Sequence, residues 1–148
     1  KLIIAGEGKL EKKLKELAKE VGVSKYIEWK TYRMSTKEQR IEWNKCDVFV
    51  LPSIYKTEAF GIVLLEAMAC GAPCVGTTIS GTTYVLEDAG IAVKPKDEKA
   101  LADAIIKVLT NEKLEKELKK KSLAKAKKFD WENISKMFEK TYKVALSK

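Results

Sequence analysis

Hydrophobic and polar residues form short blocks along the chain, and these blocks predict strands separated by helices. The predicted strands are short runs rich in Leu, Ile and Val: residues 2–5, 26–29 and 47–51, a strand through Val75, and residues 91–93. Two of them end in turn residues, Gly6-Glu7-Gly8 and Pro52-Ser53. Such alternation predicts an α/β fold with a doubly wound parallel sheet, whose ligands bind beyond the carboxyl ends of the strands.

The helices are predicted by apolar residues at helical spacing and by signals at their ends. Ser35 with Glu38 forms a capping box for one helix, and Gly22 is a natural stop for the helix before it. The predicted helices cover residues 10–21, 35–44, 60–70, 101–109 and 112–128.

A last helix is predicted after Asp130, which is its N-cap. It carries an apolar stripe that we expect to be buried: Trp131, Ile134, Phe138 and Tyr142. Two adjacent helices at this end are more than the sheet needs, so we expect them to pack against something outside this segment.

The composition predicts one domain over residues 1–148, because 45% of the 148 residues are hydrophobic and a core can form. No apolar run is long enough to span a bilayer, and no signal-peptide pattern opens the chain. The chain has three cysteines, an odd number that is typical of free thiols in a reducing compartment, so we expect a cytoplasmic location. Histidine is absent, which excludes His-based acid–base catalysis and most zinc sites within this segment.

The net charge is +8, and the excess is concentrated in residues 113–128, where lysine is the commonest residue. We interpret this run as the solvated face of a surface helix. The alternative is contact with an anionic partner. We expect that partner to be a membrane surface or a lipid acceptor, which would give the protein a location peripheral to the membrane. We do not expect nucleic acid.

The segment from Ser53 to Val75 carries the chemistry. The helix predicted from Phe60 is apolar on every face except for Glu66, and a buried carboxylate is costly unless it is paired or hydrogen-bonded. Glu58 lies eight positions earlier, just before the helix.

Between the two glutamates, Phe60, Gly61 and Ile62 present backbone N–H groups at a helix N-terminus, where anions bind. The order along the chain is a hydrogen-bond acceptor (Glu58), an anion site at the helix N-terminus, and a second acceptor (Glu66). This order fits a nucleotide sugar, in which a hexose, a diphosphate and a ribose follow one another. The alternative interpretation is that Glu58 is a surface acid and that Glu66 pairs with a lysine or a backbone group.

The same stretch resembles the donor-nucleotide-binding C-terminal domain of GT-B retaining glycosyltransferases, and above all glycosyltransferase family 4 (glycosyl transferases group 1). The family has two glutamates separated by seven residues within a longer motif. The matching residues here are Glu58-Ala59-Phe60-Gly61 and Glu66-Ala67-Met68-Ala69-Cys70-Gly71-Ala72-Pro73. The resemblance covers nearly the whole chain and implies a Rossmann-like half of a GT-B fold with extra C-terminal helices.

The resemblance implies that the segment binds the donor for a hexosyltransferase that keeps the anomeric configuration. Glu58, the candidate catalytic residue, would contact hydroxyls of the transferred sugar, and Glu66 would hold the ribose hydroxyls. Donor contacts are also implied for Phe60, Gly61, Ile62, Gly6 and Gly8, and residues 30–33 would border the base. The family generally needs no metal, and we expect no cofactor besides the nucleoside diphosphate sugar.

Three departures from the family pattern concern the phosphate and base contacts. The family usually has an earlier strand with an Arg and a Lys that neutralise the diphosphate, and this chain begins after that point. Lys30-Thr31-Tyr32 stands where a glycine is usual, and Tyr84 where a glutamate is common.

We therefore expect a fragment that lacks its first strand and helix and the N-terminal acceptor domain, from an enzyme but inactive when isolated. The alternative is a catalytically inert basic scaffold that retains the fold. A nicotinamide or flavin site is disfavoured, because Glu11 occupies the third glycine position of that fingerprint.

Overall fold

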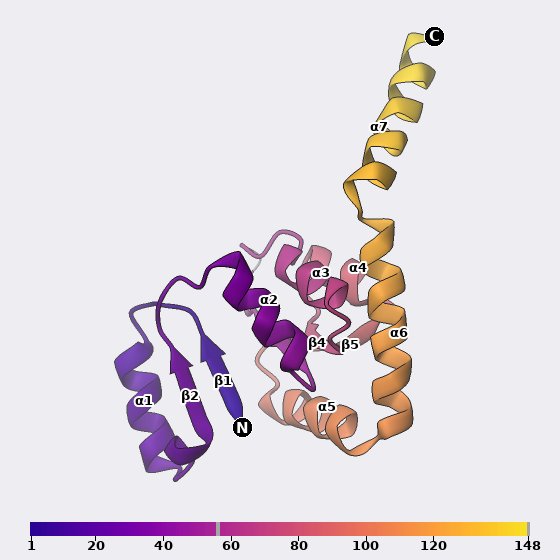
Figure 1. The fold of residues 1–148 in the computed structure, drawn as a ribbon. Helices are drawn as coiled ribbons and strands as arrows, with labels where there is room; N and C mark the ends of the chain where they lie inside the picture. Colours follow the sequence, from indigo (N-terminus) through magenta and orange to yellow (C-terminus); the bar gives the residue numbers. More distant parts are fainter. Residues whose placement is uncertain (56, 148) are drawn as a thin grey trace. The chain divides into compact units, whose positions relative to one another are not determined.

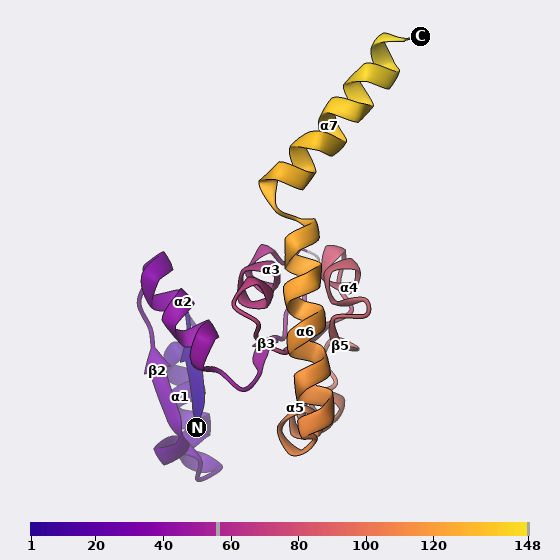
Figure 2. The same cartoon turned by 45° about the vertical axis from the view of Figure 1, so that its right-hand side comes forward.

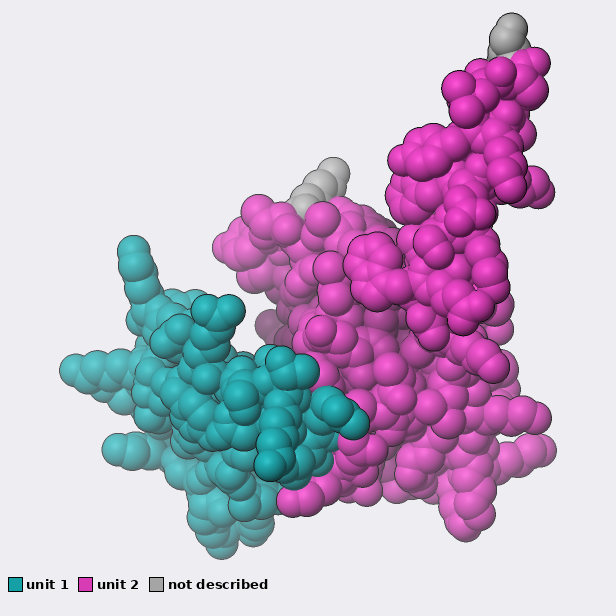
Figure 3. All heavy atoms as spheres, turned by 45° about the horizontal axis from the view of Figure 1, so that its top comes forward, with its two compact units in different colours: residues 1–41 teal, residues 42–148 magenta. Residues whose placement is uncertain are grey.

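The computed structural model describes residues 1–55 and 57–147. Two compact units make up the chain, residues 1–41 and 42–148 (Figure 3). Every strand that the structure describes is parallel to its neighbours, so the predicted α/β class of fold is confirmed.

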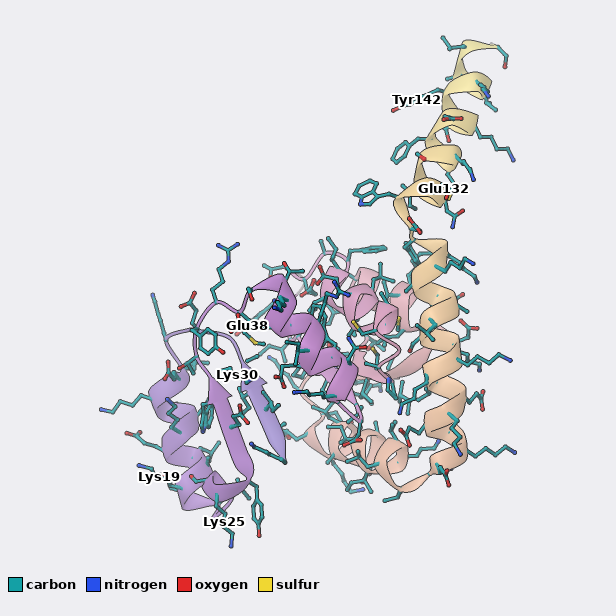
Figure 4. The ribbon with its side chains drawn as sticks, in the orientation of Figure 1. Lys19, Lys25, Lys30, Glu38, Glu132 and Tyr142 are labelled. Atoms are coloured by element: carbon teal, nitrogen blue, oxygen red, sulfur yellow. The ribbon has the colours of Figure 1, made fainter. Side chains whose placement is uncertain are left out.

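The first unit is built on two parallel strands, β1 (Leu2–Ala5) and β2 (Ile27–Lys30). Helix α1 (Glu11–Glu20) and a 3₁₀ turn, η1 (Ser24–Tyr26), connect them. Gly22 has a φ of 74° and donates its N–H to the Lys19 carbonyl, which ends α1 as the sequence predicts. Lys19 and Lys25 are labelled in Figure 4.

The capping box predicted for α2 (Thr36–Lys45) is confirmed. The Ser35 N–H and hydroxyl donate to the Glu38 carboxylate over 2.8 and 2.6 Å, and the Glu38 N–H donates to the Ser35 hydroxyl over 3.3 Å. These bonds satisfy N–H groups that the start of a helix leaves without partners. Figure 4 labels Glu38 at this end of the helix.

The second unit contains a three-stranded sheet of order β3-β4-β5. Its strands are β3 (Phe49–Leu51), β4 (Cys74–Thr77) and β5 (Gly90–Val93). The register places Val75 opposite both Val50 and Ile91. Its helices are α3 (Ile62–Ala69), α4 (Gly81–Leu86), α5 (Glu98–Thr110), α6 (Glu112–Lys128) and α7 (Trp131–Leu146).

The core of this unit has two clusters that lie on opposite faces of the sheet. Cys74 and Val75 are adjacent on the central strand and fully buried, so their side chains point to opposite faces. The first cluster includes Cys74 with residues of α3 and α4: Leu64, Ala67, Met68, Val85 and Leu86. The second includes Val75 with residues of α5 and α6: Ala104, Val108 and Leu118.

Helix α6 packs along the unit rather than lying wholly in solvent (Figures 1 and 2). Its buried Ser122 donates to the Ala72 carbonyl over 2.9 Å, and Leu118 and Lys125 are buried beside it. The predicted solvated charges lie outside this buried stripe and pair along the helix as Glu112–Lys116, Glu115–Lys119 and Glu117–Lys121. Over the described residues, no helix has the length and apolarity needed to cross a membrane.

The buried stripe predicted for the last helix is wrong. Trp131, Phe138 and Tyr142 are 83%, 55% and 62% exposed, and Ile134 is only half-buried. The reason is that α7 extends away from the sheet and the other helices of its unit, so no core lies against its apolar face (Figures 1 and 2). Tyr142 and Glu132 are labelled on this helix in Figure 4.

The strands form two hydrogen-bonded sheets, where the sequence pattern predicted a single one. Taken alone, each sheet matches a run of the usual 3-2-1-4-5-6 order of a doubly wound fold. The pair β2-β1 matches strands 3-2, and β3-β4-β5 matches strands 4-5-6. A strand in position 1 is not among those that the structure describes.

Candidate functional site

The loop of residues 58–61, named the donor loop here after the role that the resemblance implies for it, leads directly into α3. Gly61 is the N-cap of the helix and has a φ of 81°, a conformation that favours glycine. Its N–H donates to Oε1 of Glu58 over 3.0 Å, and the Leu64 N–H donates to its carbonyl over 2.9 Å. The N–H groups at Ile62 and Val63 precede that first turn, where a helix has no partners of its own for them. The loop therefore brings a carboxylate and helix-end N–H groups together, but the Gly61 N–H, which was predicted to be open to an anion, is taken by Glu58.

Helix α4 holds the donor loop from the other side. The Gly81 N–H donates to the Ala59 carbonyl over 3.1 Å. A Cβ on Gly81 would lie 2.7 Å from both the Ala59 oxygen and the Phe60 Cα, so only glycine fits this contact without a shift of the backbone. Gly81 was not predicted as a site residue, because the contact joins residues more than twenty positions apart in the sequence.

The buried position predicted for Glu66 is wrong. The side chain is exposed, as are those of Ile62 (65%) and Ala69, which share its face of α3. The reason is that the buried residues Leu64, Ala67 and Met68 cover only the side of the helix that faces the sheet. Glu66 therefore needs no buried partner, and its carboxylate is free of the desolvation penalty that a buried charge bears.

A hollow of about 220 Å³ lies beside Glu58, beyond the carboxyl end of β3. Its lining residues are Ser53, Ile54, Tyr55, Thr57 and Glu58. The Thr77 hydroxyl at the end of β4 donates to the Ser53 carbonyl over 2.5 Å and fixes one wall. Three residues that carry hydroxyls and one glutamate thus line a hollow at the edge of the sheet where doubly wound folds bind ligands. Only Glu58 of these was predicted as a site residue, although the hydroxyl-rich run after β3 is visible in the sequence.

Gly6 and Gly8 belong to the first unit, whereas Glu58, Phe60, Gly61, Ile62 and Glu66 belong to the second. Gly6 follows β1, has a φ of 129° and donates its N–H to the Lys30 carbonyl over 3.1 Å. A Cβ at either glycine would meet no atom within 4 Å, so both positions are open.

No metal cluster is found in the parts of the chain that the structure covers, residues 1–55 and 57–147. The three cysteines are free thiols. Burial raises the pKa of the Cys46 thiol to about 11 and raises that of Cys74 further, so both stay protonated at neutral pH.

The comparison with known families identifies the chain. The sequence model described as "Glycosyl transferases group 1" matches residues 1–125. The chain belongs to this family. The expected resemblance is thus confirmed.

Curated relatives and solved structures agree with this assignment. An uncharacterized glycosyltransferase of Methanocaldococcus jannaschii is 33% identical, over 99% of this chain and 37% of the relative. Sucrose-phosphate synthase from Thermosynechococcus elongatus is similar in structure, with a TM-score of 0.81 and 25% identity, over 99% of this chain and 38% of that one. The chain thus spans little more than a third of each of these two proteins.

A third similarity concerns the fold alone. The Anabaena protein HepE, solved in complex with UDP-glucose, has a TM-score of 0.78 at 23% identity, over 96% of this chain and 40% of that one. These structures share the Rossmann-like half of the GT-B fold that the sequence implied.

Proposed function

We propose that this chain is the donor-binding part of a retaining hexosyltransferase, which moves a sugar from a nucleoside diphosphate sugar to an acceptor. The observation that carries the proposal is the donor loop: Glu58 folds onto Gly61 at the start of α3, in a member of the glycosyl transferases group 1 family. The HepE complex with UDP-glucose supports a donor of this class in a fold of this kind.

The chemistry of the second unit fits the parts of such a donor. The N-terminus of α3 carries the positive end of the helix dipole, which suits a diphosphate. The hollow beside Glu58 offers hydroxyls of Ser53, Tyr55 and Thr57 to a sugar, and the exposed carboxylate of Glu66 is an acceptor for ribose hydroxyls.

In this proposal the protein accelerates transfer by stabilising the negative charge that develops on the leaving diphosphate. Helix-end N–H groups at Ile62 and Val63 would supply part of that stabilisation. Glu58 would position the sugar and would not act as a nucleophile. No metal or cofactor takes part in this proposal.

The rest of the parent protein would supply the acceptor site, because the matched relatives are far longer than this chain. We place the protein in the cytoplasm, where free thiols such as those of Cys46 and Cys74 persist. The lysine-rich face of α6 would contact a membrane surface or a lipid acceptor.

The proposal is tested by isothermal titration of this chain, and of the longer parent protein, with UDP, GDP and ADP. We expect saturable binding of one nucleotide. Glu66→Gln should weaken it about 10-fold or more, because a hydrogen bond to a charged group contributes about 1.5–3 kcal/mol. The matched control is Glu139→Gln, which changes an exposed glutamate of α7 and should leave the affinity unchanged.

Glu58→Gln separates the two carboxylates. A Gln side-chain oxygen still accepts the Gly61 N–H, so the loop is kept. We expect this variant to bind the free nucleotide normally and the nucleotide sugar more weakly. If neither protein binds any of the three nucleotides, the donor-binding proposal is wrong and the inert basic scaffold replaces it.

A further inference from the structure

The geometry points to Tyr84 and Phe129 as positioning residues for the donor loop: their rings hold Phe60, and through it the N–H groups of Ile62 and Val63, in the orientation that receives the donor. This inference rests on the proposed function for its link to the donor. The three rings, Phe60, Tyr84 and Phe129, are called the Phe60 cluster below.

The rings of the Phe60 cluster form a closed triangle. Their centroids are 5.7 Å apart for Phe60 and Phe129, 6.4 Å for Phe60 and Tyr84, and 6.0 Å for Tyr84 and Phe129. Both contacts of Phe129 are edge-to-face, the arrangement that aromatic rings prefer. Each ring therefore touches the other two, and the position of Phe60 is set from two sides.

The three rings come from three separate elements. Phe60 belongs to the donor loop, Tyr84 to α4, and Phe129 is the C-cap of α6. The loop and α4 are also joined by the hydrogen bond from Gly81 to Ala59. The cluster adds the end of α6, two residues before α7 begins.

Tyr84 is itself fixed by a buried cation. Nζ of Lys125 lies 4.8 Å from the centroid of the Tyr84 ring and 2.6 Å from the Glu87 carboxylate. The Lys125 side chain is 4% exposed. Because Lys125 lies on α6, the charge holds Tyr84 against the same helix end that carries Phe129.

The placement of Phe60 matters because the next residues make the proposed phosphate contacts. Gly61 has a positive φ, and a Cβ added there would lie 3.1 Å from the Leu64 and Thr82 side chains, so little space surrounds this residue. A rotation of Phe60 would therefore be transmitted to Gly61 and to the first N–H groups of α3. We expect the cluster to reduce the motion of these groups before the donor arrives, which lowers the ordering cost of binding.

Hydrogen exchange without ligand measures the loop directly. Tyr84→Leu and Phe129→Leu should increase exchange of the hydrogen-bonded Gly61 and Leu64 amides about 3-fold to 10-fold, the range expected for one aromatic contact, while the amides of β4 keep their protection. Tyr84→Phe should restore the wild-type rate, because it keeps the ring. Phe138→Leu is the matched control, since it removes one ring of the Phe138–Tyr142 contact on α7, away from the loop.

Titration of the same variants with UDP, GDP, ADP and their glucose or mannose conjugates tests the link to the donor. We expect Tyr84→Leu and Phe129→Leu to weaken donor binding by a similar factor and Tyr84→Phe and Phe138→Leu to leave it unchanged. Unchanged exchange of the Gly61 and Leu64 amides in both leucine variants would overturn the inference, as would faster exchange spread equally over β4. If wild-type protein binds no nucleotide, the proposed function fails, and the exchange result alone still decides whether the cluster holds the loop. Tyr84 is 58% exposed, so Tyr84→Leu gives a folded variant even where Phe129→Leu does not.

Discussion

The backbone N–H of Gly81 donates to the carbonyl of Ala59 over 3.1 Å, and this contact leaves no space for a side chain at Gly81. A Cβ there would lie 2.7 Å from the Ala59 oxygen and 2.8 Å from the Phe60 ring. We therefore expect Gly81→Ala to lower the free energy of unfolding by about 1–3 kcal/mol, the usual range for overpacking a tight site. Urea denaturation followed by circular dichroism measures the change.

Gly8→Ala is the control for that substitution. A Cβ at Gly8 would meet nothing within 4 Å, and the residue lies outside the helices and strands. We expect its unfolding free energy to stay within about 0.5 kcal/mol of wild type. Equal losses for the two alanine variants would show that the Gly81 contact is not tight.

The Lys125–Glu87 ion pair is asymmetric, with side chains 4% and 61% exposed. Glu87→Gln would leave the buried ammonium without the carboxylate charge that pairs with it, beside the Tyr84 ring, whereas Lys125→Met would leave a carboxylate that water already reaches. We expect Glu87→Gln to cost about 1–3 kcal/mol and Lys125→Met less than about 1 kcal/mol, the first value being reduced from the range for fully buried pairs. Thermal and urea unfolding of both variants measure the difference, and a larger loss for Lys125→Met would contradict it.

The positions of the helices and strands were largely predictable, because they follow from local patterns. Residues 2–5 and 112–128 form a strand and a helix with the predicted bounds, and the Ser35–Glu38 capping box is present. Helix α4 was missed because it is only six residues long and begins with Gly-Thr-Thr, which is typical of a turn. Local sequence carries little information about so short a helix.

Burial was less predictable, since it depends on neighbours that periodicity does not identify. Glu66 lies among apolar residues in the sequence, yet the side of α3 that it shares with Ile62 is exposed. The apolar pattern of α7 is real, but the pattern cannot show what lies against it. The contacts of Gly81 and Phe129 with the donor loop join distant segments, and no local signal marks them.

The exposure of α7 leads to a prediction about its largest side chain. Trp131 is 83% exposed, so Trp131→Ala should change the unfolding free energy of this chain by less than about 0.5 kcal/mol. Leu64→Ala should cost about 2–5 kcal/mol, because Leu64 is fully buried and its loss leaves a cavity. Urea denaturation of the two variants tests the contrast. A large loss for Trp131→Ala would mean that α7 packs against the rest of the unit in solution.

The capping box at α2 predicts how its contribution changes with pH. The hydrogen bond from the Ser35 hydroxyl, followed by that from the Ser35 N–H, lowers the pKa of Glu38 below its ordinary value of 4.5. A carboxylate with a lowered folded pKa stabilises the protein above its unfolded pKa, and this contribution is lost as the pH falls through the folded pKa. Ser35→Ala should therefore be less stable than wild type at about pH 6, and the difference should shrink at about pH 3.

An NMR titration of Glu38 should give a higher pKa in Ser35→Ala than in wild type. Ser135→Ala, which removes a hydroxyl that donates to the backbone carbonyl of Glu132, should show no such pH dependence. An unchanged Glu38 pKa in Ser35→Ala would show that the hydroxyl does not hold the carboxylate in solution.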